Sequence, residues 1–101
     1  MSNPRFYWYA HVKHTIEQYP NGIDRNTRQG AADYVSVSKV VEATKLLQDG
    51  EERLQLVKMI YWKRSHTIEG AANVLHISPR TAHRWRHAFI YAVAKEMGYY
   101  N

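Results

Sequence analysis

Residues 67–87 read TIEGAANVLHISPRTAHRWRH, and this stretch decides the fold. It contains two signals for the start of a helix, Thr67 and Ser78-Pro79, because Thr and Ser hydroxyls cap helices and proline is pre-organised for the first helical position. The two starts leave room only for a short helix ending near Leu75, a tight turn and a longer second helix. The stretch therefore predicts a helix-turn-helix over about residues 67–97.

The residues around the predicted turn fit this motif. Ala71 and Ala72 place small side chains where the second helix must cross the first, and Ile77 is apolar and can fill the turn. His76 stands at a position where glycine is common, because the residue there often takes a positive φ. Histidine tolerates that conformation better than most residues do.

The predicted second helix has two unlike faces. Residues spaced by three and four form an apolar stripe that should pack against the core, namely Ala82, Trp85, Phe89, Val93 and Met97. The remaining face carries basic residues near the start of the helix, namely Arg80, His83, Arg84 and His87. Because Trp85 lies on the apolar stripe, we expect it to pack in the core rather than stack on bases, and its truncation should unfold the protein.

The basic face has the chemistry of a helix that reads DNA. The major groove admits one α-helix, and the planar guanidinium of arginine can bind both acceptors of a guanine. The candidate base-reading residues are therefore Arg80, His83, Arg84 and His87, with Arg80 and Arg84 foremost. The candidates for positioning the phosphates are Lys63, Arg64, Thr67, Ser78, Thr81 and Arg86. The alternative is that the arginines only form the solvated face of an amphipathic helix.

The chain before residue 36 predicts one helix and a linker. Asn3-Pro4 is a start signal, and apolar residues at helical spacing continue until Pro20, which defines a first helix within residues 1–19. Residues 20–35 are rich in turn-forming residues and lack an apolar period, so we expect a linker there. The DNA-binding body is expected to occupy residues 36–101.

Two more helices are expected in the first part of that body. Ser36 is the predicted cap of one helix, which Asp49-Gly50 ends. Asp49 and Glu52 have the spacing of a capping box for the next helix, which runs to about Trp62. Because no segment alternates with a period of two, the predicted fold is all-α, a small helical bundle of about five helices.

The composition and charge of the chain indicate which kinds of protein and of binding partner to expect. The net charge is +5, and residues 51–101 carry eight Lys or Arg against four Asp or Glu, so a polyanionic partner is expected for this half. The absence of cysteine removes disulfides and thiolate zinc sites and fits a cytoplasmic setting. No membrane span is expected, because no apolar run approaches the roughly 20 residues that cross a bilayer. No targeting signal is expected either, because Pro4, Arg5 and four aromatic residues stand where a charged segment and a long aliphatic stretch would be needed.

No combination of residues predicts catalysis, a cofactor or a metal. His83 and His87 have the spacing of two metal ligands, but arginines surround them and no carboxylate completes a site. Glu51, Glu52 and Glu69 look like helix-start residues rather than paired catalytic acids. The protein is therefore not expected to be an enzyme.

Four consecutive aromatic residues, Phe6, Tyr7, Trp8 and Tyr9, cover all sides of the first predicted helix. They exceed what one intramolecular face can bury, so they are a candidate surface for a partner or for a homodimer. A dimer would also pair two half-sites on DNA. The alternative is that these rings pack across the other helices of the same chain.

Several stretches resemble a family of phage proteins. They are Tyr61 to Arg64, Thr67 to Ala72, Leu75 to Thr81 and Arg84 to Arg86, followed by Phe89 to Ala94 and Met97 to Tyr99. The chain resembles the RinA/ArpU group of phage transcriptional activators over about 65 residues from Ser36 onward. The helix-turn-helix of that group is similar to the promoter-reading domain of sigma factors. The resemblance implies a phage or prophage protein that activates late or packaging genes in the bacterial cytoplasm, with RNA polymerase as a partner.

Two other functions fit the same features. A small terminase subunit of a phage also binds DNA through a short helical domain, but it must form a ring. A basic helical interaction module would instead bind an acidic protein or a membrane surface. Specific binding of double-stranded DNA separates the transcriptional regulator from the interaction module, and a ring-sized oligomer would favour the terminase.

Overall fold

The computed structural model describes residues 7–19 and 21–99, and every regular element within them is helical. The first three helices are α1 (Tyr9–Gln18), α2 (Arg28–Lys45) and α3 (Gly50–Val57). A π-helical turn, η2 (Lys58–Trp62), continues α3 directly, and α4 (Ile68–Leu75) and α5 (Pro79–Glu96) follow. The predicted all-α bundle of about five helices is confirmed for this part of the chain.

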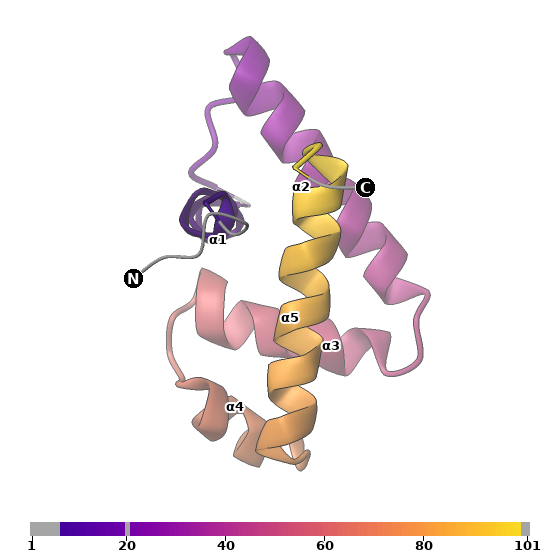
Figure 1. Cartoon of the computed structure of the whole chain (residues 1–101). Coiled ribbons are helices and arrows are strands. Elements are labelled where there is room, and N and C mark those ends of the chain that lie inside the picture. The colour runs from indigo at the N-terminus through magenta and orange to yellow at the C-terminus, as the bar shows by residue number, and fades with distance from the viewer. Residues whose placement is uncertain (1–6, 20, 100–101) are drawn as a thin grey trace.

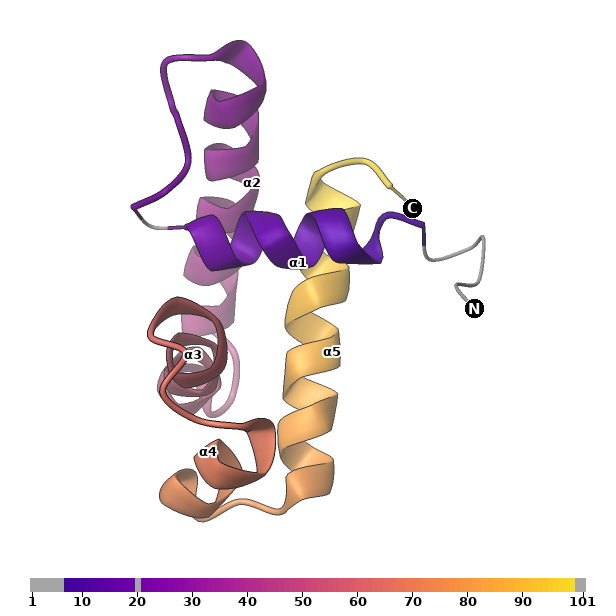
Figure 2. The same cartoon turned by 90° about the vertical axis from the view of Figure 1, so that its left-hand side faces the viewer.

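The last helix, α5, is the central element of the bundle. α1 crosses its C-terminal half, while α4 packs beside its first turns (Figure 1 and Figure 2). α2 and α3 also pack against α5, and α2 passes it at an oblique angle (Figure 1). The two ends of the described chain lie close together, since the ring centroids of Tyr7 and Tyr99 are 6.1 Å apart.

Two clusters of buried side chains hold the helices together. The larger cluster joins α1, α2, η2 and the C-terminal half of α5, and its fully buried members include Val12, Ile16, Val37 and Val93. The smaller cluster joins α3, α4 and the first turns of α5. The apolar stripe predicted on α5 is confirmed: Ala82, Trp85, Phe89 and Val93 are buried, and Met97 packs against the larger cluster.

α1 is tied to the body by packing and by one indole hydrogen bond. The start signal Asn3-Pro4 lies outside the described residues, and α1 ends before Pro20 as the sequence predicts. Proline has no amide hydrogen, so the carbonyl of Ile16 cannot receive the usual helical hydrogen bond from position 20. The Nε1–H of Trp62 donates to that carbonyl instead, at 2.9 Å.

The predicted start of the second helix is wrong. α2 begins at Arg28 rather than after Ser36, and its cap is Thr27, whose Oγ1 accepts the amide hydrogen of Gly30 at 2.9 Å. Residues 28–35 were predicted to belong to a linker and are helical instead. The first turns of α2 extend beyond the other helices (Figure 1 and Figure 2) and bury few side chains. Because these turns have no core to face, they need no apolar stripe, and the sequence shows no apolar period there.

The capping box predicted at Asp49 is also wrong. Asp49 takes the left-handed conformation, with φ 59°, and its side chain caps nothing. The chain turns back tightly against the end of α2, and a side chain at Gly50 would collide with the carbonyl oxygens of Thr44 and Lys45. Close backbone approach, rather than a side-chain cap, therefore determines how α3 begins. Its helical path continues through η2 to Trp62, which is the end that the sequence predicts.

The described residues of the aromatic stretch divide between the core and the solvent. Trp8 is buried, and its ring lies edge-on to Tyr91 with a centroid distance of 5.2 Å. Tyr7 remains 73% exposed. Phe6 lies outside the described residues. Packing within the chain therefore accounts for Trp8. In the ranges 7–19 and 21–99, no helix is both long and apolar enough to cross a membrane.

Candidate nucleic-acid interface

The turn between α4 and α5 has the geometry that its residues predict. Thr67 Oγ1 accepts the amide hydrogen of Gly70 at 3.0 Å, and Ser78 Oγ accepts that of Thr81 at 3.1 Å. His76 ends α4 in the left-handed conformation, with φ 59° and ψ 40°. The expected positive φ and both expected caps are therefore confirmed.

Small side chains let the start of α5 approach α4 closely. Ala71 and Ala72 of α4 and Ala82 of α5 are fully buried in the smaller cluster, and Ile77 packs against them from the turn. Trp85, one turn further along α5, is only 6% exposed in the same cluster. These contacts determine which side of α5 faces the body and which side faces solvent.

The four candidate base-reading residues all lie on the solvent side of α5. Arg80, His83, Arg84 and His87 are exposed, which is the orientation that their helical spacing predicts. Within residues 7–19 and 21–99, neither Arg80 nor Arg84 forms an ion pair or a side-chain hydrogen bond. Their donors are therefore available to a ligand.

The two histidines of this face are held by neighbours. His83 Nε2 lies 3.4 Å from Glu69 Oε2 of α4, and its Nδ1 lies 3.0 Å from Arg86 Nη2. Because arginine can only donate, Nδ1 accepts and Nε2 carries the hydrogen that points at Glu69. The ring of His87 stacks on Tyr91 with a centroid distance of 3.9 Å. No group of three or more metal-binding side chains gathers in the described part of the chain.

Arg86 lies on another side of α5. Its side chain is half-buried and faces a depression that Tyr9, Glu17 and Tyr61 also line. Burial raises the pKa of Tyr61, and the positive charge of Arg86 opposes this shift only in part. Arg86 therefore meets the basic face only at its edge, through His83, and it lines this depression rather than the solvent side that carries Arg80 and Arg84.

Three of the other candidate phosphate contacts flank the start of α4, while Ser78 and Thr81 lie at the start of α5. Lys63, Arg64 and Thr67 are exposed in the segment that follows η2. Arg64 has a positive φ of 51°, and its Nη2 lies 3.6 Å from Glu17 Oε1. Lys63 has no ion pair within the described residues. The charge of Lys63 is thus more available to a phosphate than that of Arg64.

Three carboxylates lie close to the basic residues of α5, a placement that the sequence does not predict. Glu69 touches His83, while Asp49 and Glu52 line a shallow depression that they share with Arg84. Asp49 and Glu52 precede Arg84 by more than 30 residues, so no local spacing could have revealed them. The surroundings of Arg84 are therefore less positive than the charge count of this half of the chain indicates.

Comparisons with known proteins return no match. No family model, no curated protein and no solved structure matches this chain. What indicates a function for this chain is therefore the geometry of α4 and α5, the local charges and the resemblance seen in the sequence.

Proposed function

We propose that this protein binds double-stranded DNA in a sequence-specific manner, with the first half of α5 in the major groove. The observation that carries this proposal is the pair of exposed arginines, Arg80 and Arg84, which have no ion pair or side-chain hydrogen bond with any described residue. Trp85 and Phe89 anchor the opposite side of the same helix in the core. A rigidly held helix with an outward basic face fits a groove that is wide enough for one helix.

In this proposal the two arginines read bases and other groups position the backbone. Each arginine can donate two hydrogen bonds to one guanine, which discriminates against other bases by about 1–3 kcal/mol. Ser78 Oγ donates to Thr81 Oγ1 at 3.0 Å, which leaves the hydrogen of the Thr81 hydroxyl free. The Thr81 hydroxyl and Lys63 bind phosphates, which orients the protein without selecting a sequence. His83 and Arg86 already bond each other, so they contribute less than Arg80 and Arg84.

We further propose that the bound site is a promoter region and that the protein regulates transcription. The resemblance to the RinA/ArpU phage activators supports activation of late or packaging genes, with RNA polymerase as the partner. A homodimer that binds two half-sites remains compatible with the exposed aromatic Tyr7.

The test is selection of bound duplexes from a pool with a randomised central segment, in the presence of non-specific competitor DNA. The proposal predicts enrichment of one consensus that contains guanines. Fluorescence anisotropy on the selected duplex should then show an affinity that falls steeply with salt, because cations of the protein displace counterions from the phosphates. A pool that shows no enrichment would refute sequence-specific binding.

Single variants then separate the two roles. Arg84→Ala should lower affinity for the selected site about 5- to 150-fold and relax the preference at one base pair, while Lys63→Ala should weaken all duplexes equally. Arg28→Ala is the matched control, because it removes an exposed positive charge from the far end of α2. Equal losses for Arg84→Ala on selected and random duplexes would show that Arg84 does not read a base.

A further inference from the structure

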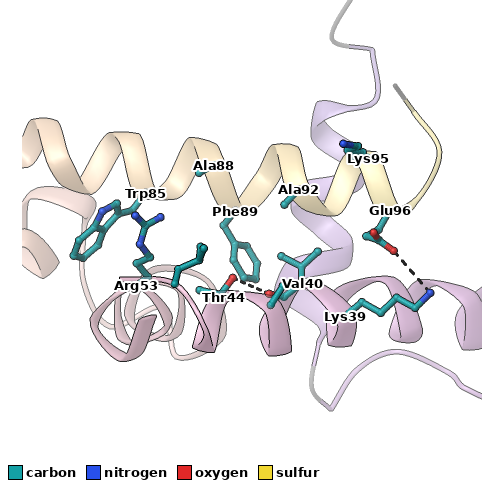
Figure 3. A pocket seen from close by; sticks show the side chains of 12 residues that line it. Lys39, Val40, Thr44, Arg53, Trp85, Ala88, Phe89, Ala92, Lys95 and Glu96 are labelled. Atoms are coloured by element: carbon teal, nitrogen blue, oxygen red, sulfur yellow. Dashed lines mark hydrogen bonds and ion pairs between the residues drawn. The ribbon is translucent and has the colours of Figure 1, made fainter. Parts of the chain in front are cut away.

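A groove with apolar walls runs between α2 and α5, beside the basic face of α5 (Figure 3). Val40 lines it from α2, Leu47 lines it from the turn that follows α2, and Phe89 and Ala92 line it from α5. Its volume is about 260 Å³. A cavity of roughly 150 Å³ with apolar walls holds benzene, so this groove has room for a body of about two fused rings.

The polar residue on the floor of the groove has its hydrogen-bond donor already in use. Thr44 is the buried polar residue there, and its hydroxyl donates to the carbonyl of Val40 within α2, at 2.7 Å (Figure 3). Since that hydrogen is used inside the helix, the Thr44 hydroxyl has no hydrogen left to donate to a ligand. A bound molecule therefore needs an apolar body.

At one end of the groove, the side chain of an arginine is held in a fixed position by its neighbours. The guanidinium of Arg53 lies over the ring of Trp85, with its carbon 5.2 Å from the ring centroid (Figure 3). Its Nε–H donates to the carbonyl of Gln48 at 3.0 Å, so two interactions hold the half-buried side chain in place. No carboxylate among the described residues pairs with it. Both terminal amino groups of Arg53 are therefore available to an anion.

At the other end of the groove, a positive and a negative side chain lie close together. Lys39 Nζ lies 4.0 Å from Glu96 Oε1, so these two charges largely offset each other there (Figure 3). Glu96 would repel an anion placed beside it, although Lys95 is also close. Asp49 and Glu52 lie near Arg53 in an adjoining depression, but neither forms an ion pair with it. The Arg53 end is therefore distinguished by a guanidinium held in place beside the apolar groove, not by a larger net positive charge.

We propose that this groove is a binding site for a small organic anion with a flat apolar body, whose carboxylate pairs with Arg53. Arginine binds carboxylates through two parallel hydrogen bonds, and the stacked position over Trp85 reduces the freedom that binding must remove. Trp85 and Phe89 line the groove and also anchor α5, so the ligand would contact the helix to which we assign DNA binding. The site itself is independent of that assignment.

The experiment titrates ¹⁵N-labelled protein with a matched series of naphthalene probes and follows amide chemical shifts. The probes are 2-naphthoate, the neutral 2-naphthamide and the cationic 2-naphthylmethylamine. We expect 2-naphthoate to move the amides of Val40, Phe89 and Ala92 and to bind about five- to tenfold more tightly than the amide, because its hydrogen bonds to Arg53 are charge-assisted. The amine should bind most weakly.

Two variants and one control locate the site. Arg53→Gln should remove the difference between 2-naphthoate and 2-naphthamide, and Ala43→Leu should abolish binding of both by filling the groove from an exposed position of α2. The matched control is Arg25→Gln, because Arg25 also lies over an aromatic ring, Tyr34, but away from the groove. It should leave binding unchanged.

Three outcomes would overturn the proposal. Equal affinity of the acid and the amide in the wild-type protein would exclude pairing with Arg53. Shifts confined to surface lysines would show charge attraction without a groove. If no probe moves the groove amides at about 1 mM while an acidic amphipathic helical peptide does, the groove binds proteins instead. Circular dichroism of each variant verifies that the fold is retained, so a lost signal reports on the site.

Discussion

Replacing Trp85 with alanine tests whether the back of α5 holds the bundle together. The side chain is 6% exposed and packs in the smaller cluster with Leu56, Ala72 and Ala82. Removing a buried tryptophan costs about 3–5 kcal/mol, because both the burial of apolar surface and the close packing are lost. Loss of the contact with Arg53 adds about 0.5–1 kcal/mol. A protein of this size has a total stability of about 5–15 kcal/mol, so Trp85→Ala should unfold a marginal protein.

The assay is urea denaturation followed by far-UV circular dichroism, which needs no tryptophan signal. Together these two contributions should lower the free energy of unfolding by about 3.5–6 kcal/mol in Trp85→Ala. Tyr7→Ala is the control, since Tyr7 is aromatic but 73% exposed, and it should change stability by no more than about 0.5 kcal/mol. A loss below about 1 kcal/mol for Trp85→Ala would contradict the claim that this residue anchors α5.

Three further predictions use the same denaturation assay. Ser78→Ala should cost about 1 kcal/mol, because Ser78 Oγ caps α5 through the amide of Thr81 at 3.1 Å; an unchanged midpoint would contradict the role of this cap. His76→Gly should stabilise by about 0.5–1 kcal/mol, since φ is 59° there and glycine tolerates that conformation without strain; destabilisation would mean that the imidazole makes a necessary contact. Burial raises the pKa of Tyr61, so the folded protein holds this proton where the unfolded chain releases it, and stability should fall as pH rises above about 10. Tyr61→Phe should weaken that alkaline loss, and identical pH profiles would refute the assignment to Tyr61.

The local features of α4 and α5 could be predicted because short-range interactions decide them. A hydroxyl at Thr67 or Ser78 reaches an amide three residues away, and apolar residues spaced by three and four share one helix face whatever the rest of the chain does. The positive φ of His76 follows from the same local geometry. These elements are contained in about 30 consecutive residues.

Packing between segments that are far apart in the sequence determined two features that local sequence patterns do not reveal. The first turns of α2 are helical without an apolar period, because they extend past the core and bury few side chains. Asp49 forms no capping box, because the close approach of Gly50 to the end of α2 imposes a left-handed turn. In both places the tertiary contacts, or their absence, outweigh the local sequence signal.

The sequence alone determined that the chain is helical, where α4 and α5 begin, and which residues share the basic face of α5. Only the tertiary structure decided that Arg84 lies near Asp49 and Glu52, that Arg86 turns away, and that Arg53 closes one end of a groove. The physical reason is distance along the chain. Helix periodicity relates residues within a few turns, whereas a site between two helices depends on how their side chains pack.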